Sequence, residues 1–224
     1  MNIPQVLEFI GELVQNNNRE WFAENKDRYD TSRRYFEMIS TELIREIVKF
    51  DPDLAHVEAK DCVFRIYRDT RFSHDKTPYK NHYGVFIAAN GGRKSVRGGY
   101  YLHLEPGKSF VATGVWCPPP PLLKALRQCV YDNFDELNQI ISEPEFTKWF
   151  RGFYDEDKLK TVPRGFPADF PGAELVKLKH YMVEYTLPGE ILSSASFVEE
   201  VAGIFKAAYP LNKFLNYTVD ETKL

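Results

Sequence analysis

Side chains that could bind an anion are concentrated in one segment, Phe64 to Gly84, which reads FRIYRDTRFSHDKTPYKNHYG. The segment combines five Lys or Arg with two Asp and several aromatic rings. Arginine suits anion binding because its planar guanidinium donates two parallel hydrogen bonds to a carboxylate or phosphate and stacks on rings. Two local carboxylates cannot neutralise five cations, so the pattern predicts a site for a small phosphate- or carboxylate-bearing ligand. The predicted site residues are Arg65, Tyr67, Arg68, Asp69, Arg71, Asp75, Lys76, Tyr79 and Lys80.

The same segment fits two other interpretations. In the first, arginines pair with aspartates inside the segment and pin the loop, so that the protein is a structural domain with no ligand. The candidate pairs join Arg68 or Arg71 to Asp69 or Asp75. In the second, a non-enzymatic interaction module docks an acidic protein or a nucleic acid through this face. The sequence does not decide whether the protein is an enzyme; in an enzyme, Asp69 or Asp75 would act as base beside cations that stabilise a phosphoryl or carboxyl group.

Charge is distributed unevenly along the chain. Residues 60–108 carry ten Lys or Arg and four Asp or Glu, a net charge of +6, whereas the whole chain carries −3 and the remainder therefore −9. A positive segment inside an acidic protein predicts a focused field for a negatively charged partner. Acidic helices around the segment could instead pair with these cations. The overall acidity argues against a dedicated nucleic-acid binder, because much of the surface would repel a polyanion.

Other binding chemistries lack a recognisable motif. The loop Gly91–Gly99, GGRKSVRGG, does not have the order of a phosphate-binding P-loop, and we expect a hairpin tip with three solvated cations. The same cations could instead grip a phosphate backbone. The five histidines show no HExxH or HxH spacing, so no metal site and no cofactor are predicted. The nearest approach to a ligand set is His74, Asp75 and His82, and we expect His103 on the polar face of a strand.

The three cysteines predict neither catalysis nor disulfide bonds. Cys62, Cys117 and Cys129 are odd in number and widely spaced, form no CxxC motif, and lie beside apolar residues, so we expect buried structural thiols. A reducing cytoplasm fits this usage best. No apolar run is long enough to span a bilayer, and the acidic, cation-free N-terminal stretch does not have the pattern of a secretory signal.

Apolar residues recur at helical spacing in two parts of the chain, which predicts helices before and after a central block of strands. The first helix, with Asn2 as its cap, is expected to end at 16–18. A capping box is predicted at Ser142 and Glu145, and Pro210 is expected to end the last helix. The expected helices cover about residues 2–15, 19–25, 28–50, 122–141, 142–150 and 194–209.

Between the helices, apolar residues alternate with a period of two, which predicts strands. Glu105-Pro106-Gly107-Lys108 places Pro and Gly where a type II turn needs them. The predicted fold is a single α+β domain over residues 1–224, an antiparallel β-meander sheet with N-terminal, central and C-terminal helices packed around it. The expected strands cover residues 63–67, 84–89, 99–104, 110–116 and 180–187.

Several stretches, in order over nearly the full chain, are similar to one family. They are NNREWF from Asn17, FRIYRDTRFSHDKTPYKNHYG from Phe64, GGYYLHLEPG from Gly98, Gly114 with Trp116, and LKTVPRGF from Leu159. On these stretches the chain resembles the bacterial and fungal domain of unknown function 2461, with RDTRFSHDKTPYK the most specific of them. The resemblance implies that the chain is one unit, and it implies no activity, cofactor or catalytic residue.

Overall fold

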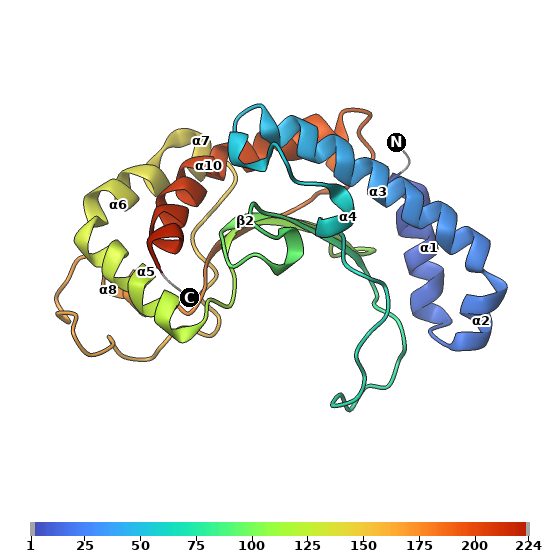
Figure 1. Cartoon of the computed structure of the whole chain (residues 1–224), viewed down its shortest axis with the longest axis horizontal. Coiled ribbons are helices and arrows are strands. Elements are labelled where there is room, and N and C mark those ends of the chain that lie inside the picture. The colour runs from blue at the N-terminus through green and yellow to red at the C-terminus, as the bar shows by residue number, and fades with distance from the viewer. Residues whose placement is uncertain (1–2, 223–224) are drawn as a thin grey trace. The chain divides into compact units, whose positions relative to one another are not determined.

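A computed structural model describes residues 3–222 (Figure 1), so Asn2, the predicted helix cap, lies outside the described residues. The chain forms helices and a four-stranded antiparallel sheet with the order β1-β2-β3-β4, which confirms the α+β class and the meander. None of the described helices is long and apolar enough to cross a bilayer. The strands are β1 (Tyr83–Ile87), β2 (Gly99–Leu104), β3 (Phe110–Val115) and β4 (Tyr181–Thr186).

The chain divides into two compact units, each built from several segments. Unit 1 comprises the residues up to Arg93 together with Tyr101–Val111 and Thr186–Gly203. Unit 2 comprises Lys94–Tyr100, Ala112–Tyr185 and the residues from Ile204 onward. A single domain over residues 1–224 therefore stays a prediction.

In unit 1, the long helix α3 supports the first strand. The α1 helix packs against α3, and both bury a continuous apolar stripe that includes Val6, Ile10 and Leu43. Phe36 of α3 stacks on Tyr83 of β1, with ring centroids 5.1 Å apart. The helices of this unit are α1 (Ile3–Gln15), α2 (Arg19–Glu24), α3 (Lys26–Val48), α4 (Ala59–Cys62) and α9 (Gly189–Leu192), with a 3-10 turn at Pro52–Leu54.

In unit 2, two short helices replace the long one expected over residues 122–141. That prediction is wrong because the chain leaves helical geometry at Asn133, whose side-chain amide donates to the Cys129 carbonyl at 3.0 Å and closes the first helix. The predicted capping box is also wrong, because Ser142 ends one helix and the next begins at Pro144. The helices of this part are α5 (Pro120–Asp132), α6 (Phe134–Ser142), α7 (Pro144–Thr147) and α8 (Ala173–Val176).

The last helix, α10 (Phe197–Glu221), continues through Pro210, so the predicted end at that residue is wrong. Pro210 is exposed, and the helix beyond it is held by buried asparagines. Asn216 accepts a hydrogen bond from the Gly98 N–H at 2.7 Å and donates one to the Gly98 carbonyl at 3.0 Å. Asn212 donates to the Gly99 carbonyl at 3.2 Å. These tertiary bonds and the burial around them offset the helical hydrogen bond that proline removes.

The segment 63–67, which was expected to be a strand, makes only isolated bridges. Val63 pairs with Val85 and Tyr67 with Tyr79, both antiparallel, and the neighbouring strand begins at Tyr83 rather than at residue 84. The interruption between these bridges shapes the candidate site.

We predict that Gly114→Ala strongly destabilises the sheet of unit 2. Gly114 in β3 has a φ of +125°, and a Cβ there would lie 2.1 Å from the Tyr181 carbonyl oxygen. Backbone strain and steric overlap together should cost about 2–4 kcal/mol of unfolding free energy. Urea denaturation measures this loss.

Gly203→Ala is the matched control for this prediction. Gly203 lies inside α10 with nothing near its missing Cβ, so alanine should be neutral or add about 0.5–1 kcal/mol. Equal unfolding midpoints for the two variants would contradict the close β3–β4 approach at Gly114.

Candidate functional site

Residues 64–68 pair with residues 78–84 in an antiparallel register that is interrupted once. The N–H of Arg68 donates to the Pro78 carbonyl at 2.9 Å, and the N–H of Lys80 donates to the Ile66 carbonyl at 2.8 Å. The next bond joins the Phe64 N–H to the Gly84 carbonyl at 3.0 Å, so that Arg65 alone faces residues 81–83. Such a bulge bends the strand and re-aims its side chains. It explains why no continuous strand forms here.

The base of the loop is fixed by aromatic packing and by one asparagine. The buried ring of Tyr79 stacks on Phe22 with centroids 4.0 Å apart, and the exposed Tyr67 ring lies 5.4 Å from that of Tyr79. The Asn17 side chain donates to the Tyr79 carbonyl at 3.0 Å and accepts from the Tyr79 N–H at 3.1 Å. These contacts give the two predicted ligand-binding tyrosines a structural role at the loop base.

Within the loop, three of the five predicted cations have internal partners. Arg68 forms an ion pair with Asp75 at 2.5 Å, and Arg71 forms one with Asp69 at 2.6 Å. The hydrogen bonds from Arg71 lower the pKa of Asp69 to about 2. The Lys76 ammonium donates to a loop carbonyl at 2.9 Å. The internal pairing considered from the sequence therefore exists for both arginines.

The other two predicted cations, Arg65 and Lys80, lie at the base of the loop and form no ion pair with an acidic side chain among residues 3–222. The Lys80 ammonium lies over the Phe64 ring, 5.1 Å from its centroid. Burial lowers the pKa of Lys80, and the positive charge of Arg65 lowers it further. Arg65 also helps to lower the pKa of Asp69, but neither Arg65 nor Lys80 forms an ion pair with an acidic side chain among the described residues.

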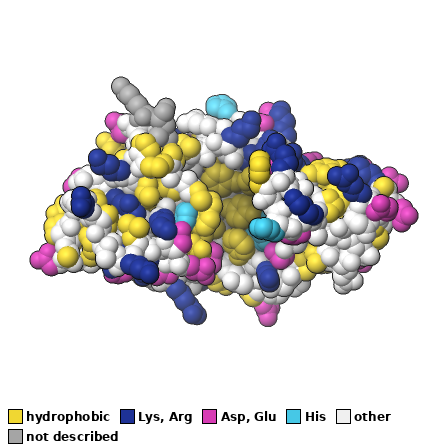
Figure 2. Space-filling view, turned by 90° about the horizontal axis from the view of Figure 1, so that it is seen from below, with side chains coloured by type: hydrophobic (Ala, Val, Ile, Leu, Met, Phe, Trp, Pro, Cys, Tyr) yellow, Lys and Arg dark blue, Asp and Glu magenta, His cyan; other side chains and the backbone are white. Residues whose placement is uncertain are grey.

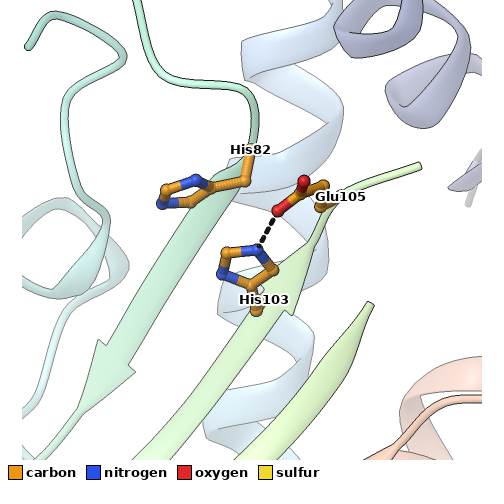
Figure 3. Close-up of side chains that lie close together, drawn as sticks. All are labelled: His82, His103 and Glu105. Atoms are coloured by element: carbon orange, nitrogen blue, oxygen red, sulfur yellow. Dashed lines mark hydrogen bonds and ion pairs between the residues drawn. The ribbon is translucent and has the colours of Figure 1, made fainter. Parts of the chain in front are cut away.

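Beside these cations lies a cluster formed by His82, His103 and Glu105, drawn in Figure 3. His82 directly precedes β1, His103 lies near the end of β2 and Glu105 directly follows β2, and antiparallel pairing places these strand ends together. One ring nitrogen of each histidine and one carboxylate oxygen all lie within 4.8 Å of one another. The Nε2 of His103 lies 3.0 Å from the Glu105 carboxylate, and the two imidazole rings stack with centroids 4.2 Å apart.

A hydrogen-bond network surrounds the cluster. The Asn81 amide donates to Glu105 at 2.8 Å, and its oxygen lies 2.9 Å from Nδ1 of His82. The Tyr101 hydroxyl lies 3.0 Å from Nδ1 of His103. Burial lowers the pKa of His82 to about 3, and the neighbouring His103 and Lys80 contribute to the lowering. Burial also lowers the pKa of His103, against the opposing effect of Glu105, so both rings are neutral at pH 7.

This cluster differs from the ligand set considered in the sequence. His74 is exposed, Asp75 is paired with Arg68, and only His82 of that set belongs to the group of metal-type ligands found among residues 3–222. His103, expected on a polar face, is buried. The sequence does contain a signal for the cluster: His103 lies in the predicted strand and Glu105, two residues later, directly follows its end, a spacing that keeps both side chains on one face.

A second histidine–acid pair lies in unit 2. His180 lies 3.1 Å from the Asp157 carboxylate, and its ring stacks on Trp116 at 4.0 Å. Its Nδ1 accepts a hydrogen bond from the Cys117 N–H at 3.0 Å, so that nitrogen is not available as a base for the thiol. The three cysteines are free, but Cys117 is exposed, and the expectation that all three are buried is wrong.

The glycine-flanked loop expected to carry three solvated cations also uses its arginines internally. Arg93 donates to the Lys60 carbonyl at 2.9 Å. Arg97 is mostly buried and forms an ion pair with Asp220 at 3.2 Å. That expectation is therefore wrong for both arginines. On the face shown in Figure 2, Lys and Arg side chains are interspersed with Asp and Glu side chains.

Comparison with known proteins gives one match. The family model described as Conserved hypothetical protein (DUF2461) matches residues 5–214, which is most of the chain. No curated protein and no solved structure matches the chain.

We predict that Asp75→Asn loosens the loop without unfolding the protein. Asp75 accepts the Thr77 N–H at 2.9 Å and pairs with Arg68, and both are exposed interactions worth about 1 kcal/mol or less. Trypsin should cleave the loop faster, while the melting temperature should change by no more than about 3 °C. Limited proteolysis and thermal denaturation measure the two effects.

Asp30→Asn, which removes one partner of the exposed Lys26–Asp30 pair on α3, is the control and should leave loop cleavage unchanged. Unchanged cleavage in Asp75→Asn would show that the Arg68–Asp75 pair does not order the loop.

Proposed function

We propose that this chain, which belongs to the family described as Conserved hypothetical protein (DUF2461), binds a small anionic ligand that carries a phosphate or carboxylate group. In this proposal Arg65 and Lys80 supply the attractive charge. The observation that supports it is that these two cations are neighbours and that neither forms an ion pair with an acidic side chain among residues 3–222. Two like charges held close together repel each other, and an anion between them relieves that repulsion.

The surroundings of the two cations suit a phosphate or carboxylate. Lys80 is half-buried against the Phe64 ring, so its charge is less screened by water than that of an exposed lysine. Arg65 is exposed and can offer the two parallel donors that an oxyanion accepts. Arg65 lies opposite the bulge at residues 81–83 and Lys80 directly precedes it, so both residues flank the same interruption in strand pairing.

The remaining predicted site residues then form a frame around the ligand. Arg68 with Asp75 and Arg71 with Asp69 hold the shape of the loop, Lys76 ties two of its turns, and Tyr67 and Tyr79 fix its base. The loop cations add to the positive field without having to contact the ligand. The three free cysteines suit a reducing compartment, and the cytoplasm is part of this proposal.

A thermal-shift screen tests the proposal with inorganic phosphate, sugar phosphates, nucleotides and organic acids at two salt concentrations. A small-ligand site should give a saturable rise of about 5–10 °C in melting temperature at a concentration about 100 times Kd. Arg65→Met and Lys80→Met should each weaken binding about tenfold, because each removes a charge-assisted hydrogen bond.

Arg71→Met is the matched control, since its guanidinium is already paired with Asp69, and it should change Kd less than about twofold. An equal loss of affinity in Arg71→Met would show that the ligand binds at the loop instead of at Arg65 and Lys80. If only polyanions raise the melting temperature and high salt abolishes the rise, the face docks a macromolecule and the small-ligand proposal fails.

A further inference from the structure

We infer that His82, His103 and Glu105 form a binding site for a divalent transition-metal ion, for which Zn²⁺ is the probe. Two imidazoles and one carboxylate are a donor set that first-row transition metals accept. The inference concerns different side chains from the anion proposal and does not depend on it.

The separation of the ligand atoms is close to that of a coordination sphere. At bonds of about 2.0–2.2 Å, two ligand atoms on a tetrahedral zinc lie about 3.3 Å apart. The three candidate atoms lie within 4.8 Å of one another, and the His103–Glu105 pair already lies at 3.0 Å. A small decrease in the distances between these three atoms would therefore bring all of them within bonding distance of one ion.

Glu105 supplies an independent reason for a bound cation. Its side chain is only 16% exposed, yet no Lys or Arg among residues 3–222 forms an ion pair with it. Its two side-chain partners are the Asn81 amide and the neutral imidazole of His103. A carboxylate this far from water is costly without a positive charge. A divalent ion would supply that charge.

The network also places lone pairs where metal ligands need them. A carboxylate cannot donate, so the amide nitrogen of Asn81 must face Glu105 and the amide oxygen must face His82. Nδ1 of His82 is therefore the protonated nitrogen, which leaves Nε2 with a lone pair. This is the arrangement in which an outer hydrogen bond fixes the tautomer of a metal-binding histidine.

His103 can reach the same arrangement by a change of tautomer. Without an ion, its Nε2–H donates to Glu105, and its Nδ1 accepts from the Tyr101 hydroxyl. With an ion on Nε2, the proton moves to Nδ1 and donates to the Tyr101 oxygen, so the ring stays neutral and keeps one hydrogen bond. A hydroxyl can act both as a hydrogen-bond donor and as an acceptor, so Tyr101 suits either tautomer of His103.

His82 is the ligand that must turn. The two stacked rings are inclined by 27°, so their lone pairs lie in nearly parallel planes and do not yet meet at one point. His103 is buried and its ring also stacks with Phe110, 4.6 Å away. His82 is only partly buried and lies in the bulged segment before β1. Rotation of its side chain would bring Nε2 to the ion.

Isothermal titration of chelator-treated, metal-free protein with ZnCl2 in phosphate-free buffer tests the site. The wild-type chain should bind one ion per chain. His82→Gln and Glu105→Gln should each weaken binding about tenfold or more. Lys80→Met should bind Zn²⁺ more tightly, because the positive charge of Lys80 reaches His82 and opposes the ion. In the anion proposal, Lys80→Met instead weakens binding of the anion. The two proposals therefore predict opposite effects of this variant on their ligands, and either one can fail without the other.

His180→Gln is the control, because His180 is as buried as His103 and, like His103, is hydrogen-bonded to an acid. It should leave Zn²⁺ affinity within about twofold of wild type. If Glu105→Gln alters the circular dichroism spectrum, the test uses His82→Gln with Co²⁺ as the probe. Loss of the visible Co²⁺ absorption bands in His82→Gln would then support the inference, and unchanged bands would overturn it. No stoichiometric binding by the wild-type protein, or an equal loss in His180→Gln, would overturn the inference.

Discussion

The antiparallel pairing of residues 63–68 with residues 78–85 is the constraint on which the candidate site depends. It closes the base of the loop, and its single interruption lies opposite Arg65, with His82 inside the bulge at residues 81–83 and Lys80 directly before it. Because β1 continues from this segment and pairs with β2, the same register brings His82 beside His103 and Glu105. A regular strand without the two extra residues would shift the pairing of residues 63–65 by two positions along the neighbouring segment.

Charge compensation then separates the structural residues from the candidate binding residues. Arg68 and Arg71 are paired within the loop, where exposed ion pairs contribute little to stability but restrict its conformation. Closer to the sheet, both positive and negative side chains in the described part of the chain remain without an ion-pair partner. Among the described residues, Arg65 and Lys80 form no ion pair with an acidic side chain, and the mostly buried Glu105 forms none with a Lys or Arg. Ions of opposite charge from solution would compensate each group, which is the physical basis of both proposals.

Local patterns in the sequence predicted the local parts of the fold. The turn at residues 105–108 forms as expected, with a Gly107 φ of +74° and the Lys108 N–H donating to the Glu105 carbonyl at 3.1 Å. The strand 99–104 was predicted with its observed bounds. Both depend on neighbours in sequence, namely turn chemistry and alternation, which are visible without the tertiary structure.

Features set by distant partners were not predictable in the same way. The helix passes Pro210 because Asn212 and Asn216 bond to the backbone of residues 98–99, more than one hundred positions away. The bulge at residues 81–83 depends on how two segments meet. The excess of cations at residues 65–80 was visible in the sequence. The sequence did not show which of these cations would form an ion pair with a local aspartate. The His103–Glu105 pair was visible as two residues at the spacing of one strand face, and only the register between β1 and β2 adds His82.

Long-range ¹H–¹⁵N spectra of the histidines in metal-free protein, followed from pH 7 to pH 4, test the register and the hydrogen-bond network most directly. The account predicts that His82 is a neutral ring protonated on Nδ1 throughout, since its pKa is lowered to about 3, and that His103 at pH 7 is protonated on Nε2. Titration of His82 near pH 6.5, or protonation of its Nε2, would contradict the placement of His82 between Asn81 and the His103–Glu105 pair.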